Sequence, residues 1–208
     1  MGSIRAVSRC LNNELENLRT PEPEPVEPIE PVEPSNPSTS EMLHLETIAS
    51  PIGPLTLAMR GERLCLLHFG ADRTAAETTL RRWYRDAPVA EPSGTMPIAG
   101  LLASYFGGDT AVLDGIEVEL NGTPFQQRVW QALREVRAGQ TASYGEIARR
   151  IGAPDAVRAV GAANGANPVA IVVPCHRIIG SSGSLTGYGG GLERKRWLLR
   201  HEGGERLF

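Results

Sequence analysis

Val172-Val173-Pro174-Cys175-His176-Arg177-Ile178 is the stretch that decides how the second half of the chain folds and what it can do. The apolar run 171–173 predicts a short buried strand. Pro174 predicts the end of that strand, because proline cannot donate a ladder hydrogen bond. Cys175 would then lie at the rim of a sheet, beside an imidazole and a guanidinium that favour its nucleophilic thiolate form. The alternative is a buried structural cysteine, the more common state of this residue in an apolar run.

Three helices are predicted before this stretch. Thr123-Pro124 opens the first, with an N-cap residue and a proline in the first helical position. Ser143-Tyr144-Gly145-Glu146 is a capping box that opens the second, which ends near Gly152. Pro154 opens the third, which runs through Asn164. The tight turn between the last two helices matches a helix-turn-helix.

The third helix carries few side chains large enough to read DNA bases. Base-edge contacts in the major groove need long polar side chains, and Arg158 is almost the only one here. Such a thin helix favours close approach to DNA in the narrow minor groove, with Arg158 protruding. Tight packing against a neighbouring helix would explain the same composition. The small residues are Ala156, Ala159, Gly161, Ala162 and Ala163.

The first half of the chain, from residue 42, predicts a small α+β domain. We expect strands over 43–49, 55–60 and 64–69, helices over 73–85 and 98–106, and irregular chain with some strand over 112–120. This half has no cluster that suggests catalysis. His44 and His68 are interpreted as structural histidines, with zinc binding as the minor alternative.

The first 41 residues have a different composition. Residues 21–37 contain seven prolines interspersed with glutamates, which predicts an extended, disordered segment. A short helix over 11–18 would precede it. We therefore predict a disordered extension over 1–41, an α+β domain over 42–122 and a second domain over 123–208.

The net charge of −3 is unevenly distributed along the chain. Residues 1–41 carry −5, residues 42–123 carry −4 and residues 124–208 carry +6. The basic last segment favours an anionic partner, most commonly nucleic acid, although solvated helix faces produce the same excess. Three widely spaced cysteines suggest neither disulfides nor a metal knuckle. Without an apolar span or a secretory signal in the sequence, we expect a cytoplasmic protein.

Several motifs occur together in the order and spacing typical of one family. They are Ser143-Tyr144-Gly145-Glu146, Gly165-Ala166-Asn167-Pro168-Val169, Pro174-Cys175-His176-Arg177, Tyr188-Gly189-Gly190-Gly191-Leu192 and the run 194–203. The chain resembles the O6-alkylguanine-DNA alkyltransferases, especially the bacterial stand-alone type. The resemblance is dense over 123–203, looser over 43–122 and absent before residue 42. It implies an α+β fold, in which a small α/β domain of ribonuclease H-like type precedes a mostly helical domain with a winged helix-turn-helix.

The resemblance also implies roles for individual residues. Cys175 would accept the alkyl group, with His176 as base through a bridging water and Glu202 polarising His176. Asn167 would brace the active-site strand and its turn, and Tyr144 would contact the flipped guanine. The helix that contacts DNA would use Arg158, which fills the gap in the base stack, with Ala156, Ala159, Gly161 and Ala162. The pocket would be formed by Tyr188, Gly189, Gly190, Ile178, Val169 and Ala170.

The implied function is direct-reversal DNA repair. The protein would flip O6-alkylguanine, and less well O4-alkylthymine, out of duplex DNA and transfer the alkyl group irreversibly to Cys175. The product is a thioether, a poor leaving group, so we expect one turnover per molecule. The resemblance implies a monomer that approaches double-stranded DNA through the minor groove without membrane, metal or cofactor, and it leaves cooperative binding open.

Three other functions are weighed against this one. A non-catalytic lesion-binding protein is the main alternative, but such relatives carry tryptophan in place of Cys175. A cysteine hydrolase would turn over repeatedly, and a helix-turn-helix regulator would need major-groove contacts that the third helix does not supply. The chain departs from the family pattern at position 170, where it has alanine and many members have proline. We expect Ala170 to make the pocket wider at this wall.

Overall fold

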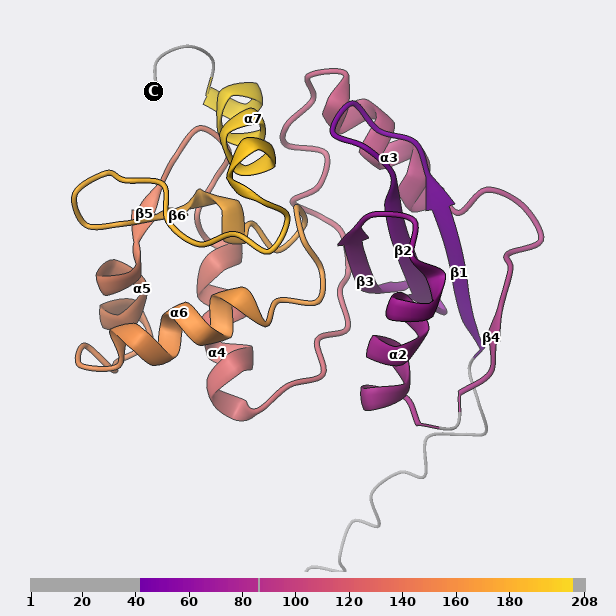
Figure 1. The fold of residues 1–208 in the computed structure, drawn as a ribbon, viewed down its shortest axis with the longest axis horizontal. Coiled ribbons are helices and arrows are strands. Elements are labelled where there is room, and N and C mark those ends of the chain that lie inside the picture. The colour runs from indigo at the N-terminus through magenta and orange to yellow at the C-terminus, as the bar shows by residue number, and fades with distance from the viewer. Residues whose placement is uncertain (1–41, 86, 204–208) are drawn as a thin grey trace, which may run out of the picture. The chain divides into compact units, whose positions relative to one another are not determined.

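The computed structural model describes residues 42–85 and 87–203. The first of these residues form a four-stranded sheet (Figure 1). The sheet order is β3-β2-β1-β4, with β1 (Leu43–Ile48), β2 (Leu55–Arg60), β3 (Arg63–Phe69) and β4 (Val89–Ala90). The first three strands form an antiparallel meander, whereas β4 runs parallel to β1. The three predicted strands are confirmed. The two-residue β4 was not predicted, because a strand so short has no periodicity to detect.

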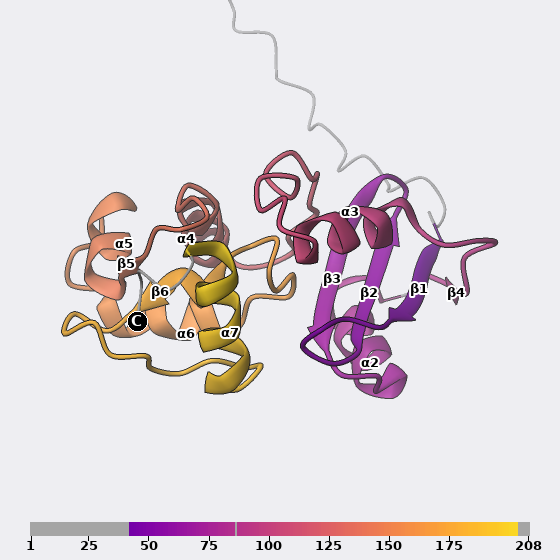
Figure 2. The same ribbon diagram turned by 90° about the horizontal axis from the view of Figure 1, so that it is seen from above.

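Two helices cover opposite faces of this sheet (Figure 2). α2 (Arg73–Trp83) begins at Asp72, whose side chain accepts a hydrogen bond from the Ala75 amide. It packs with Leu43, Leu45, Ala58, Cys65 and Leu66 in one small core. α3 (Pro97–Phe106) has its apolar face in a second, larger core. Both helices are confirmed to within two residues.

The second half is mostly helical, with a two-stranded parallel ladder of β5 (Ala142–Ser143) and β6 (Ile178–Ile179). Its helices are α4 (Pro124–Arg134), α5 (Tyr144–Arg150), α6 (Val157–Gly165) and α7 (Leu192–Gly203). Thr123 and Ser143 cap α4 and α5, as their sequence motifs predict, and Ser143 forms the predicted capping box with Glu146. Thr123 also completes a capping box with Gln126, which was not predicted. The mixed α/β composition of the fold agrees with the predicted class.

The helix expected from Pro154 begins later, at Val157. The Ala156 amide donates to the Ala153 carbonyl at 2.9 Å, so Pro154 lies in a turn rather than in the first helical turn. Gly152 precedes this turn with a φ of 71°. A left-handed glycine at this position is a common C-terminal cap and ends α5. The turn over 153–156 then takes up the residues that were expected to form the first turn of the next helix.

The strand expected over 171–173 is absent, and this prediction was wrong. Val169 forms an isolated bridge with Leu67, and the chain then turns back, so that the Val173 amide donates to the Val169 carbonyl at 2.9 Å. Ile171 has a φ of 69°, an outlier for a β-branched residue. Full burial produces the same apolar run in a turn as in a strand, which is why the sequence pattern misled.

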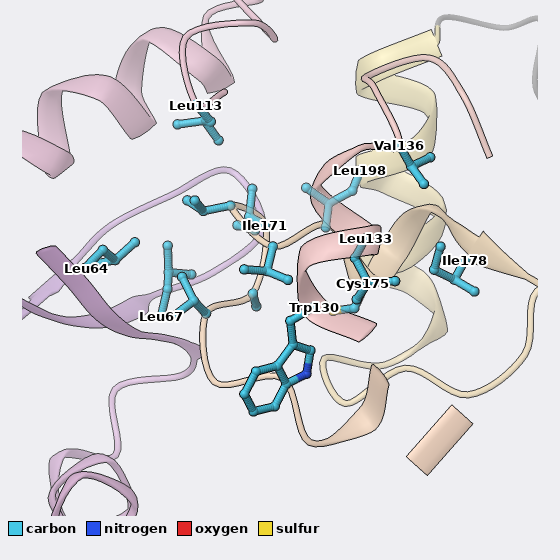
Figure 3. Packing of buried hydrophobic residues seen from close by; sticks show 14 of the residues in the cluster. Leu64, Leu67, Leu113, Trp130, Leu133, Val136, Ile171, Cys175, Ile178 and Leu198 are labelled. Atoms are coloured by element: carbon cyan, nitrogen blue, oxygen red, sulfur yellow. The ribbon is translucent and has the colours of Figure 1, made fainter. Parts of the chain in front are cut away.

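The larger core includes residues on both sides of position 122 (Figure 3). Leu64 and Leu67 come from β3, and Leu133, Ile178 and Leu198 come from the helical half. All described residues belong to one compact unit. The predicted domain limits at 122/123 stay a prediction, and those of the extension 1–41 lie outside the described residues, as does the helix expected over 11–18.

Among the described residues, no helix is long and apolar enough to cross a membrane.

Candidate active site around Cys175

Cys175 is the first residue of η1 (Cys175–Arg177), a single turn of 3-10 helix directly after Pro174. Its side chain is almost buried, with 6% of the residue exposed, yet it lies on the wall of a cavity of about 520 Å³. The expected position on a sheet rim is therefore replaced by a position at the start of a helical turn. The cavity supplies what a reactive cysteine needs, which is space in front of the sulfur.

The cavity wall combines predicted and unpredicted residues. Four residues that were predicted to form the pocket line it, namely Ala170, Tyr188, Gly189 and Gly190. They are joined by Tyr144, Gly161 and Asn167, for which other roles were predicted, and by His68, Phe69, Asn164, Gly165 and Gly187. Val169 and Ile178, which were predicted for the same pocket, are fully buried and are not among the residues that line the cavity. His68 and Phe69 come from β3, so the first half of the chain contributes directly to this site.

Asn167 clamps the turn that leads to Cys175. Its Nδ2 donates to the Val173 carbonyl at 2.8 Å, and its Oδ1 accepts from the Val169 amide at 3.0 Å. Both atoms of the side-chain amide are thus used to close the loop that holds Ile171 in its unusual conformation. The clamp acts on a turn alone, because no strand forms there.

The sequence predicts that the imidazole and guanidinium beside Cys175 favour its thiolate form, but in the structure burial has the larger effect on its pKa. Burial raises the pKa of Cys175, while a hydrogen bond from Asn167 and the positive charge of Lys195 act in the opposite direction. Arg177 does not reach the sulfur as a counter-ion, since its guanidinium is paired with Glu202. Burial therefore favours the neutral thiol of this cysteine over its thiolate.

Glu202 is the centre of a buried polar cluster behind Cys175. Its Oε1 lies 2.9 Å from Nε2 of His176 and 2.8 Å from Nη2 of Arg177, and its Oε2 accepts from Nε of Arg177 at 2.8 Å. Only 1% of the Glu202 side chain is exposed. Burial alone would raise the pKa of Glu202, but the interactions with His176 and Arg177 hold it well below its usual range.

His176 is fully buried, and burial lowers the pKa of its imidazole against the opposing effect of Glu202. Nε2 faces Glu202, whereas Nδ1 is buried with no hydrogen-bond partner among the described residues. An unpaired buried nitrogen is costly unless something else binds there. Nδ1 is therefore a natural position for a water molecule or a transferred proton.

Two buried residues near Cys175 and His176 were missed from the sequence. Lys195 is fully buried, donates from Nζ to the carbonyls of Ile178 and Thr186 at 2.6 and 2.8 Å, and has its pKa lowered by burial to about 8. It lies three and four residues before Leu198 and Leu199 on α7, a spacing that marks the buried face. Tyr105 of α3 donates its hydroxyl proton to Oε1 of Glu202 at 2.7 Å. Nothing local in the sequence marks Tyr105, because it is 97 positions from Glu202.

The face of α6 that was expected to meet DNA is open. Arg158, Ala159 and Ala162 are exposed, Ala156 and Gly161 are half-buried, and Val160, Ala163 and Asn164 face the core. Packing therefore accounts for Ala163 but not for the small residues at 159 and 162. In the described part of the chain, no group of three or more His, Cys, Asp or Glu side chains could hold a metal ion.

Comparison with protein families agrees with this arrangement. Residues 124–204 match the family model described as "6-O-methylguanine DNA methyltransferase, DNA binding domain". This stretch contains α4 to α7, Cys175 and the whole Glu202 cluster except Tyr105. The cysteine, its cavity and the matched family together define a DNA-binding methyltransferase of DNA repair.

Individual relatives make the assignment more specific. The chain is 50% identical over 161 residues to the methylated-DNA–protein-cysteine methyltransferase of Salmonella typhimurium, covering 76% of this chain and 94% of that one. It is 52% identical to that of Mycobacterium tuberculosis, covering 77% and 93%. The chain belongs to the methylated-DNA–protein-cysteine methyltransferase family.

Solved structures show the same similarity. The crystal structure of the Mycobacterium tuberculosis O6-methylguanine methyltransferase matches with a TM-score of 0.63 and 47% identity, over 78% of this chain and 93% of that one. A crystal structure of the M. tuberculosis protein in complex with DNA matches with a TM-score of 0.64 and 48% identity, over 77% and 92%.

Proposed function

We propose that this protein repairs O6-alkylguanine in double-stranded DNA by transferring the alkyl group irreversibly to Cys175. The observation that carries the proposal is that Cys175 lies on the wall of a cavity of about 520 Å³. Cavities of this size hold small organic groups in many proteins. Because the O6 atom of guanine is hidden inside the duplex, the base must leave the stack to reach such a cavity.

The proposed reaction is an in-line displacement at the alkyl carbon. The sulfur of Cys175 forms a bond to this carbon, the bond from the carbon to O6 breaks, and its electron pair stays on guanine. The thiol proton passes through a water molecule to Nδ1 of His176, the buried nitrogen that has no hydrogen-bond partner among the described residues. Guanine, which gains charge as it leaves, takes up one proton from solvent water, and the protonated His176 releases one proton to solvent, so that both groups end neutral. Since Cys175 loses its own proton to His176 only as the reaction begins, its raised pKa in the free protein is compatible with this path.

The cavity wall supports recognition of the purine. Tyr144 lines the cavity and would donate to a ring nitrogen of the flipped base, which would reduce the charge on the leaving group. The amide of Gly189 would face O6, and Tyr188 would close one side. The carbonyls of Cys175 and Ile178 would accept from the exocyclic amine. That of Ile178 already accepts from Lys195, and a carbonyl has a second lone pair for this purpose.

The exposed face of α6 supports an approach through the minor groove. Ala159 and Ala162 let the backbone come close, and Arg158 protrudes to fill the space that the flipped base leaves. α5 and α6 would form the helix-turn-helix of a winged domain, after a first domain of ribonuclease H-like type. The charge of +6 over residues 124–208 favours binding to phosphates. We propose that a monomer binds, with O4-alkylthymine as a poorer substrate.

A non-catalytic lesion-binding function is not favoured. The relatives at about half identity are named methyltransferases, and the chain retains a cysteine on the cavity wall.

A label-transfer experiment tests the proposal. The full chain is incubated with an excess of duplex DNA that carries O6-methylguanine with a radiolabelled methyl group, and protein-bound label is followed over time. We expect one methyl group per chain and then no further reaction. Cys175→Ala should take up no label and still bind DNA, because binding uses α6 and phosphate contacts.

Cys65→Ser provides a matched control. Cys65 is also a buried free cysteine, but its Sγ faces the Ala58 carbonyl and burial raises its pKa to about 12. This variant should take up label like the unmodified chain. Label in Cys175→Ala, or continuing turnover of the unmodified chain, would contradict the proposal.

A further inference from the structure

Tyr105 links the first half of the chain to the buried cluster at Glu202. The residue is fully buried on α3, where its ring packs edge-on against Phe106 and His201, with centroids 5.2 and 5.1 Å apart. Its carbonyl also lies 2.7 Å from Nε2 of His201. The ring is therefore held by contacts that do not depend on the hydroxyl group.

The hydroxyl group has a separate interaction. It donates to Oε1 of Glu202 at 2.7 Å, the same oxygen that faces His176 at 2.9 Å and Arg177 at 2.8 Å. Such a short hydrogen bond to a buried carboxylate belongs to the strong, charge-assisted class. Oε1 is thus shared between a neutral donor from α3 and the imidazole that the proposed reaction uses.

We propose that Tyr105 is a positioning residue of the transfer reaction, which fixes the Glu202 carboxylate against His176 and limits how strongly it attracts a proton there. The inference rests on the proposed roles of Cys175, His176 and Glu202. It extends the reaction machinery into the first half of the chain, which lies outside the stretch matched by the DNA-binding-domain family model.

The physical argument concerns the charge on one oxygen. A carboxylate that accepts several hydrogen bonds spreads its charge over the donors, so each donor weakens its stabilisation of a neighbouring imidazolium. Removal of the Tyr105 hydroxyl would leave more of that charge to His176 and would also free the carboxylate to turn. His176 would then hold a proton up to a higher pH.

The other charged and titratable groups around His176 are Arg177 beside it, Cys175 before it, Lys195 and Glu202 on α7, and Tyr188 on the cavity wall. Arg177 and Lys195 both lower the pKa of His176, whereas Glu202 raises it. None of these groups is changed by a substitution at position 105. A change in the titration of His176 therefore reports on the hydrogen bond from Tyr105.

Tyr105→Phe is the test, because it removes the hydroxyl and keeps the ring. The rate of single methyl transfer is measured from pH 4 to 9, because burial lowers the pKa of His176, and under conditions in which all DNA is bound. His176 must be neutral to accept the thiol proton, so the rate falls as the pH drops through its pKa. We expect this acid limb to lie about half to one pH unit higher in Tyr105→Phe. The plateau should be about 3- to 10-fold lower, through loss of orientation.

Two further variants separate positioning from general destabilisation. Tyr84→Phe removes another buried tyrosine hydroxyl from the first half of the chain, away from Glu202, and should leave the pH profile unchanged. Tyr105→Phe should have little additional effect on the profile in a Glu202→Gln background, since the hydroxyl acts through the carboxylate.

An acid limb at the same pH in Tyr105→Phe and the unmodified chain would overturn the inference. A lower plateau without that shift would also overturn it, by showing a role in packing alone. The proposed function would fail differently, because the unmodified chain would then take up no methyl group on Cys175.

Discussion

Asn167→Ala is the substitution whose cost follows most directly from the structure. It deletes both hydrogen bonds of the clamp, at 2.8 Å to the Val173 carbonyl and at 3.0 Å from the Val169 amide. Val169 and Val173 are fully buried, so water does not replace the lost partners. The Val173 carbonyl keeps a second donor, the Cys175 amide at 2.8 Å, whereas no other acceptor faces the Val169 amide among the described residues.

The expected loss follows from these two groups. An orphaned buried amide costs about 1–3 kcal/mol, and a carbonyl that keeps one of two partners loses about 1 kcal/mol more. Ile171 has a strained backbone conformation, with a φ of 69°. Loss of the clamp would let this residue relax, and the strain energy released would offset some of the cost. We expect the free energy of unfolding to fall by about 2–4 kcal/mol.

Urea unfolding followed by tryptophan fluorescence measures this loss, with Asn164→Ala as the control. Asn164 is also a buried asparagine, with 4% exposed, but in the part of the chain that the structure describes its Oδ1 has no hydrogen-bond partner. Its truncation should cost about 1 kcal/mol or less. Equal losses in the two variants, or a loss below about 0.5 kcal/mol in Asn167→Ala, would refute the clamp reasoning.

Three further predictions concern charge, space and DNA. Glu202 has a lowered pKa in the folded state, so its stabilisation is present above the unfolded pKa of about 4.3 and is lost as the pH falls below it. Glu202→Gln should therefore cost about 3–5 kcal/mol at pH 7 and flatten the acid side of a stability–pH curve; an unchanged curve would contradict this. Gly190→Ala would place a Cβ 2.5 Å from the Phe69 ring and should cost about 1–3 kcal/mol, while Gly189→Ala, with open space around it, should be near neutral in thermal unfolding. Arg158→Ala should slow methyl transfer from duplex DNA more than transfer from free O6-methylguanine, and equal slowing would remove its role in base extrusion.

Local signals in the sequence identified most of the secondary structure. The capping boxes at Thr123 and Ser143 are complete within four residues, so they could be read without any tertiary information. The strand predicted over 171–173 was wrong because the conformation there is not decided by local sequence. That conformation depends on Asn167 and on the bridge to Leu67, about a hundred residues away, and an apolar run alone does not distinguish a buried strand from a buried turn.

In the site, too, local motifs identified some residues, whereas others depend on tertiary packing. The family motifs named Cys175, His176 and Glu202, and the structure brings the last two within 2.9 Å. Lys195 was hidden in the basic run 194–196, although its spacing to Leu198 places it on the buried face. Tyr105 and Phe69 could not be found, because their place in the site depends on how the sheet and α3 pack against the helical half.

The central claim is that one particular sulfur receives the methyl group. Digestion of the chain after reaction with an O6-methylguanine duplex, followed by fragment mass spectrometry, assigns the added methyl to a single residue. The account predicts a thioether on Cys175 and unmodified Cys65 in every reacted chain. A methyl group on any other residue, or no added methyl while O6-methylguanine disappears from the DNA, would contradict it.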